Sequence, residues 1–137
     1  MANPAVRVIK PGELDLGTAQ TAGMFRAEGV GAASVGAEGL WAGHVTVSRG
    51  VRSGAHHHGE TESAIYIISG RARFRYGDRL EHVVEAEAGD FIFVPPYIVH
   101  QEINGSDDEP VLMIVCRNHK ENIVVNVELP AGVAEEG

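Results

Sequence analysis

The stretch Gly50–Gly70, GVRSGAHHHGETESAIYIISG, places three consecutive histidines before a carboxylate and a β-type apolar run. His56 and His58 are two residues apart, so on an extended strand their side chains share one face, with Cα atoms about 6.6 Å apart. Two imidazoles at that separation can converge on one ion at about 2.1 Å from each nitrogen. On a helix they would point in nearly opposite directions. The spacing therefore predicts a metal site only if the stretch is β, with His57 on the other face.

The composition indicates a soluble globular protein. The chain has 137 residues, of which 44% are apolar and 22% charged. A chain of this length can bury a hydrophobic core without disulfides or structural metals. The formal net charge of -8 argues against nucleic acid as a partner, because phosphate binding needs a basic surface. Cys116 is the only cysteine, which excludes an internal disulfide, and its apolar surroundings predict a buried, inert thiol. No apolar stretch suits a signal peptide or a membrane span, so we expect a cytoplasmic protein without a membrane partner.

Short β-type runs separated by glycine-rich turns follow one another from Leu40 onward. We expect strands at 40–47, 64–68, 71–76, 80–86, 91–94, 98–103, 111–117 and 123–129, and an early one at 6–9. Residues 13–39 are expected to form a loop with one or two short strands. Eight to ten short strands without a strong helix predict an all-β, antiparallel sandwich or small barrel. The aromatic residues expected in its core are Trp41, Tyr66, Phe74, Phe91 and Phe93.

The histidine stretch resembles the first sequence motif of the cupin superfamily. That motif is a glycine, five residues, His-x-His, three or four residues, a glutamate, six residues and a glycine. The corresponding residues here are Gly50, His56, His58, Glu62 and Gly70.

A second stretch, GDFIFVPPYIVHQEIN, resembles the second cupin motif, which is a glycine, five residues, Pro-x-Gly, two residues, a histidine, three residues and an asparagine. The corresponding residues are Gly89, Pro95, Tyr97, His100 and Asn104. The resemblance covers about residues 40–116. It implies a single small jelly-roll barrel over 1–137, with a core at about 40–129, flexible ends at 1–5 and 130–137, and a metal inside the barrel.

The sequence departs from the cupin pattern at two positions. Tyr97 replaces the glycine before the second-motif histidine, which could alter the turn or fill the mouth of the pocket. Seven residues rather than six separate Glu62 from Gly70, so that Ser63 stands in the usual glutamate position. A one-residue change of register reverses the face of a side chain. Either a bulge turns Glu62 inward, or three histidines and water form the site.

The resemblance implies one divalent transition metal held by His56, His58, His100 and Glu62. Three neutral imidazoles with at most one carboxylate suit Zn, Fe, Mn, Ni or Cu, and the ligand types do not choose among them. Three protein ligands with open positions are typical of a catalytic rather than a structural site.

Two functional hypotheses follow. The first is a metal-dependent enzyme acting on a small organic molecule, by dioxygenase-like oxidation or by isomerisation of a sugar or keto acid. Glu62 would then be a ligand or a general base. The alternative is a non-catalytic module that holds a metal or a small ligand, because one fold hosts both kinds of function.

The residues around the predicted ligands receive less specific assignments. His44 is expected on the outer face of its strand, and Gln101 should point away from the face that carries His100. Glu102 lies in the same segment, and its face is left open. Because cupins are often dimers, a homodimer is expected, with the strands at 6–9 and 123–129 available for pairing.

Overall fold

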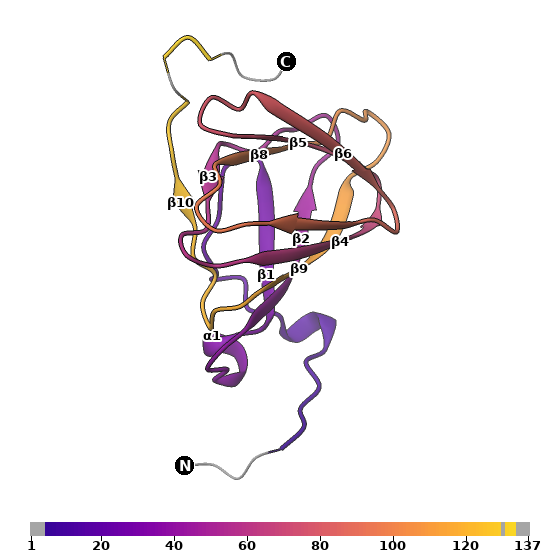
Figure 1. Ribbon diagram of the computed structural model, residues 1–137. Helices are drawn as coiled ribbons and strands as arrows, with labels where there is room; N and C mark the ends of the chain where they lie inside the picture. The colour runs from indigo at the N-terminus through magenta and orange to yellow at the C-terminus, as the bar shows by residue number, and fades with distance from the viewer. Residues whose placement is uncertain (1–4, 130, 134–137) are drawn as a thin grey trace.

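The computed structural model describes residues 5–129 and 131–133, over which ten strands form two antiparallel five-stranded sheets (Figure 1). The first sheet has the order β1 (Met24–Val30), β2 (Trp41–Val47), β9 (Val111–Arg117), β4 (Ser63–Ser69), β7 (Phe91–Val94). The second has the order β10 (Val125–Asn126), β3 (His56–His57), β8 (His100–Ile103), β5 (Arg71–Tyr76), β6 (His82–Glu87). A 3₁₀ turn at Pro11–Glu13 and the short helix α1 (Ala32–Val35) complete the elements. The predicted all-β, antiparallel fold is confirmed.

Buried and more exposed residues alternate along the central strands β2, β4 and β9. Successive side chains on a strand point to opposite faces, so alternate residues of each strand lie between the two sheets. There they form one hydrophobic cluster with residues of the second sheet. The cluster contains Trp41, Val45, Val47, Ile65, Ile67, Ala72, Phe74, Ala86, Val94, Val111, Met113 and Val115.

Gly70 alone joins β4 of the first sheet to β5 of the second. Its φ angle is 87°, and a Cβ atom there would lie 2.5 Å from the carbonyl oxygen of Pro110. Only glycine combines that backbone conformation with so close an approach. The glycine that ends the first motif therefore turns the chain from one sheet to the other directly after β4.

Several predicted elements differ from the structure. Residues 6–9 form no strand, whereas the segment 13–39, expected to be loop with one or two short strands, contains β1. The strand expected at 123–129 is reduced to the two residues of β10. Short β-branched runs such as 6–9 have strand propensity, but only pairing with a neighbour makes them strands.

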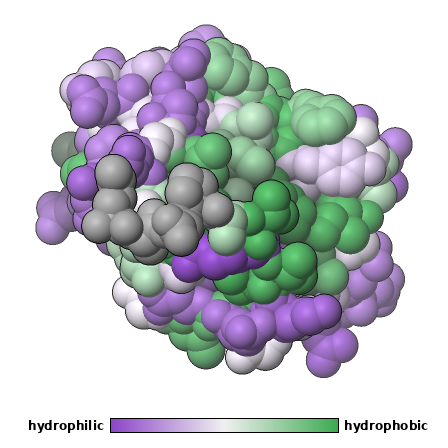
Figure 2. Space-filling view, turned by 90° about the horizontal axis from the view of Figure 1, so that it is seen from below, coloured by the Kyte–Doolittle hydropathy of each residue, from purple (hydrophilic) through white to green (hydrophobic). Residues whose placement is uncertain are grey.

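Several residues that were predicted to be buried lie instead on the outer face of the first sheet. Phe91 and Phe93, predicted to lie in the core, are 78% and 63% exposed, and Tyr66 is 38% exposed. Cys116, predicted to be buried, is also exposed. In an apolar run hydropathy does not distinguish the two faces of a strand, and here alternate residues point outward. Seen from below, the molecule has a broad hydrophobic area with hydrophilic groups around it (Figure 2).

Most of the terminal segments expected to be flexible lies outside the described residues, namely 1–4, 130 and 134–137. In the part of the chain that the structure describes, no helix has the length and apolar character needed to cross a membrane.

Candidate metal centre

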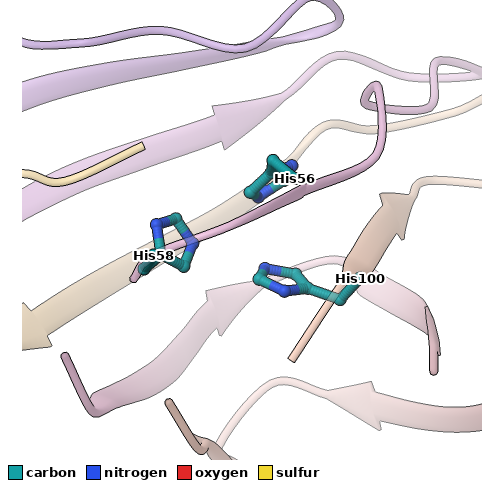
Figure 3. Close-up of side chains that lie close together, drawn as sticks. All are labelled: His56, His58 and His100. Carbon is teal, nitrogen blue, oxygen red and sulfur yellow. The ribbon is translucent and has the colours of Figure 1, made fainter. Parts of the chain in front are cut away.

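The structure brings the three predicted histidines together inside the barrel (Figure 3). His56 on β3 pairs directly with His100 on β8, and His58 follows β3 on the same face as His56. All three are buried, with 0%, 4% and 2% exposure for His56, His58 and His100. One ligand nitrogen of each ring lies within 4.8 Å of those of the other two. The extended geometry inferred from the His-x-His spacing is therefore present.

A backbone carbonyl fixes each of the three rings through its Nδ1 atom. The partners are Gly54 for His56 at 2.9 Å, Ile123 for His58 at 2.8 Å and Ile98 for His100 at 3.1 Å. A carbonyl oxygen can only accept, so each Nδ1 must carry the proton and donate it. In the neutral rings the lone pair then lies on Nε2. Such an anchored imidazole has the orientation and tautomer of a metal ligand.

Burial favours the neutral form of two of these rings, His58 and His100. Desolvation, with smaller contributions from neighbouring histidines and from Arg117, lowers the pKa of His58 far below its ordinary value. Desolvation and the neighbouring His56 likewise lower the pKa of His100 to about 3. Among the described residues, the buried Nε2 atom of His56 has no hydrogen-bond partner. With the three Nδ1 atoms donating to carbonyls, the Nε2 atoms of the rings face one another, an arrangement that a shared cation would satisfy.

Glu102 on β8 is the carboxylate that lies beside this cluster. Its Oε2 atom is 3.3 Å from His56 Nε2 and 3.9 Å from His100 Nε2, and the residue is only 3% exposed. Burial raises the pKa of Glu102, but its interactions with the two histidines and with the Arg26 guanidinium outweigh burial and lower it to about 2. The side chain is therefore ionised at neutral pH.

Glu62, the predicted carboxylate ligand, lies elsewhere. It is exposed just before β4, and its backbone N–H donates to Asn118 Oδ1 at 2.9 Å. Ser63 takes the inward position and is 2% exposed, with its hydroxyl accepting a hydrogen bond from Arg117 Nη1. Of the two alternatives that the motif spacing left open, the structure does not show the one in which a bulge turns Glu62 inward, so the assignment of Glu62 as a metal ligand is corrected. The extra residue before Gly70 leaves a serine on the inner face, because register alone decides the face.

An apolar cavity of about 270 Å³ adjoins the histidine cluster. Its lining consists of Phe74, Tyr76, Val84, Ile92, Phe93, Val94, Pro95, Ile98 and His100. His100 is thus shared between the cluster and the cavity wall. A small molecule in the cavity would meet hydrocarbon and aromatic surface on most sides, with one imidazole and one phenol as polar groups.

The side chains next to the cluster lie on the faces that strand alternation predicts. His44 is exposed, as expected, and Gln101 points away from His100, donating to the Ser53 carbonyl at 3.1 Å. Tyr97 keeps the left-handed backbone of the glycine it replaces, with φ 61°, and is 66% exposed. It is not among the residues that line the cavity. Sequence reasoning left the face of Glu102 open, although its position two residues after His100 already indicated the inner face.

Comparison with known proteins agrees with this geometry. The family described as Cupin domain matches residues 43–116, more than half of the chain. This chain belongs to the cupin family. No curated protein matches the sequence of this cupin significantly.

Solved structures share its fold. The polyketide cyclase RemF from Streptomyces resistomycificus is 20% identical, with a TM-score of 0.67 over 96% of this chain and 89% of its own. A protein with a double-stranded β-helix domain from Klebsiella pneumoniae is 18% identical, with a TM-score of 0.68 over 90% and 99%. Oxalate decarboxylase from Bacillus subtilis is 23% identical, with a TM-score of 0.68 over 79% of this chain. The cupin spans only 28% of that enzyme. At such identities the likeness establishes the fold.

Proposed function

We propose that this cupin is a metal-dependent enzyme that acts on a small, mainly apolar organic molecule. The observation that carries the proposal is the convergence of three buried imidazoles whose Nδ1 atoms are all committed to backbone carbonyls. His56, His58 and His100 would hold the metal. Their donor type suits one divalent transition metal, Zn, Fe, Mn, Ni or Cu. When bound, such a metal supplies Lewis acidity or a site for dioxygen and a substrate oxygen.

The cavity beside His100 supports an apolar substrate body. Phe74, Ile92 and Val94 in its wall would bind that body and exclude water, while His100 connects the cavity to the metal ligands. A sugar would need many hydrogen-bond partners, and this lining offers few. Of the reactions that the sequence suggested, the lining therefore favours dioxygenase-like oxidation of an apolar molecule over sugar isomerisation.

A spectroscopic probe tests both the metal site and the apolar cavity beside it. The probe is 4-nitrocatechol, a small aromatic ring with two adjacent oxygens, added to the protein loaded with Co²⁺ or Fe²⁺. We expect the visible absorption of the probe to shift on binding to the metal-loaded protein but not to the metal-free protein. Val84→Trp, which fills the cavity, should weaken probe binding about 10-fold, since overpacking costs roughly 1–3 kcal/mol.

Val83→Trp is the matched control for the cavity variant. Val83 is the neighbour of Val84 on β6, is 53% exposed and pairs with Arg75. Probe affinity should be unchanged in that variant. A metal-loaded protein that leaves the probe spectrum unaltered would favour the non-catalytic binding module. Equal binding by both tryptophan variants would overturn the assignment of the cavity.

We also propose that the cupin forms a homodimer through the outer face of β4 and β7. Exposed apolar side chains on that face support the proposal, including Tyr66, Ile68, Phe91 and Phe93, and the rings of Tyr66 and Phe91 lie 4.9 Å apart. Light scattering after gel filtration should give twice the chain mass for wild type and a single chain mass for Phe91→Lys. Val83→Lys is the control. A monomeric wild type would contradict this prediction.

A further inference from the structure

We propose that Glu102 is the protein's carboxylate metal ligand, in the role that the first cupin motif assigns to a different residue. This inference rests on the proposed metal binding by the three histidines. It moves the anionic donor from the strand that follows the histidine pair to the strand that carries His100.

The position of Glu102 follows from strand parity and pairing. Residues 100 and 102 of β8 share a face, and β8 pairs with β5 so that Glu102 lies opposite Phe74, inside the barrel. The pairing of His56 with His100 sets β3 on the other side of β8. The carboxylate is thereby held within 3.3 Å and 3.9 Å of two ligand nitrogens.

When the His56 ring is neutral, its contact with Glu102 has no donor on either side. His56 Nδ1 carries its proton toward Gly54, so its Nε2 atom offers a lone pair to a carboxylate oxygen that is itself an acceptor. The same holds for His100, whose Nδ1 proton points to the Ile98 carbonyl. Two nitrogen lone pairs and one carboxylate oxygen therefore face one another in a buried space. A cation among them would turn this repulsion into coordination.

The inner face at the start of β4 is already committed to another interaction. Ser63 has no carboxylate, and its hydroxyl accepts from Arg117 Nη1. The Arg117 guanidinium is also held by Asn122 Oδ1, to which its Nε donates at 2.9 Å. A buried guanidinium thus lies where a carboxylate ligand would otherwise be expected, while Glu62 lies at the surface. In this chain Glu102 is the glutamate placed to supply the negative charge.

Coordination by a carboxylate would change both the net charge of the site and its preference among metals. Three neutral imidazoles and one anion leave a divalent ion with one net positive charge, and the oxygen donor favours metals such as Mn²⁺ and Fe²⁺ more than an all-nitrogen site would. Replacing the anion by a neutral amide of equal shape should therefore weaken binding and change the ligand field.

The test titrates metal-free, full-length protein with Co²⁺, following the visible d–d absorption, for wild type and three variants. Glu102→Gln is expected to weaken Co²⁺ binding about 100-fold, at or above the range for residues that only orient a ligand, and to change the d–d spectrum. Glu102→Asp, which keeps the charge on a shorter side chain, should bind more tightly than Glu102→Gln. Glu62→Gln is the matched control and should keep wild-type affinity and spectrum.

Separate outcomes contradict the inference and the proposed function. Wild-type affinity and an unchanged spectrum in Glu102→Gln, with binding still abolished by His100→Ala, would overturn the role of Glu102 and leave the histidine site in place. Weaker binding without a spectral change would make Glu102 a positioning residue for His56 and would also overturn it. Absence of Co²⁺ binding in the wild type would overturn both proposals. If Glu102→Gln does not fold, the affinity and spectrum of Glu102→Asp decide.

Discussion

Replacing His100 by alanine is expected to weaken the binding of a divalent transition metal by more than about 100-fold. Zinc bound by four protein ligands gains roughly 10–16 kcal/mol, so one lost ligand costs about 3 kcal/mol or more. His100 lies between the cluster and the cavity, and its ring is 4.3 Å from His56 and 5.1 Å from His58. The measurement is metal content by mass spectrometry after purification without a histidine tag, followed by titration of the metal-free protein.

The matched control is His57→Ala. His57 lies between two of the proposed ligands in sequence but is on the other face, where its Nδ1 accepts from the Gly59 backbone N–H at 3.0 Å. We expect His57→Ala to retain the wild-type metal content. Circular dichroism of both metal-free variants would show whether the fold is preserved. Equal metal content in wild type and His100→Ala would contradict the histidine site.

Trp41→Ala is expected to lower the free energy of unfolding by about 3–5 kcal/mol, a large part of the roughly 5–15 kcal/mol typical of a domain. The indole is 0% exposed, and it lies so close to Gly43 that a Cβ there would come within 2.4 Å of the ring. The Arg117 guanidinium lies over its face, 5.4 Å from the ring centroid. The variant therefore opens a cavity and removes the aromatic partner of a buried charge.

Urea unfolding followed by far-ultraviolet circular dichroism measures this effect, because Trp41 is the only tryptophan and fluorescence would be lost with it. Leu40→Ala is the control. Leu40 precedes Trp41, is 51% exposed, and should change stability by less than about 0.5 kcal/mol. A loss below about 1 kcal/mol in Trp41→Ala would mean that the barrel interior relaxes around the missing ring.

Much of the fold could be predicted from local patterns. Strands β2, β4, β5, β7 and β9 coincide with predicted runs to within a residue at either end. Those runs alternate or are rich in β-branched residues, and their periodicity is a property of the segment itself. The strand at 24–30 was expected only as a short strand somewhere in 13–39, because the glycine and alanine around it hide its bounds. The run at 6–9 pairs with no strand in the part of the chain that the structure describes, and propensity alone does not make a strand.

The part of the candidate site that could be predicted also depends on local patterns. The His-x-His spacing is local, and so is the distance of His100 from its Pro-Pro turn, so three residues of the cluster could be identified. The choice between Glu62 and Ser63 depended on the register of β4 against β7 and β9. The motif spacing showed that either Glu62 or Ser63 would face inward, but it could not decide between them.

The sequence by itself determined the all-β class, the turn at Gly70 and the pair of imidazoles on one strand face, because each of these depends on neighbouring residues. The tertiary structure alone decided which carboxylate lies beside the histidines and which aromatic residues face solvent. Those choices depend on pairing between strands far apart in the chain. A shift of one residue in such pairing exchanges the inner and outer faces, so that Glu62 is at the surface and Glu102 lies beside His56 and His100.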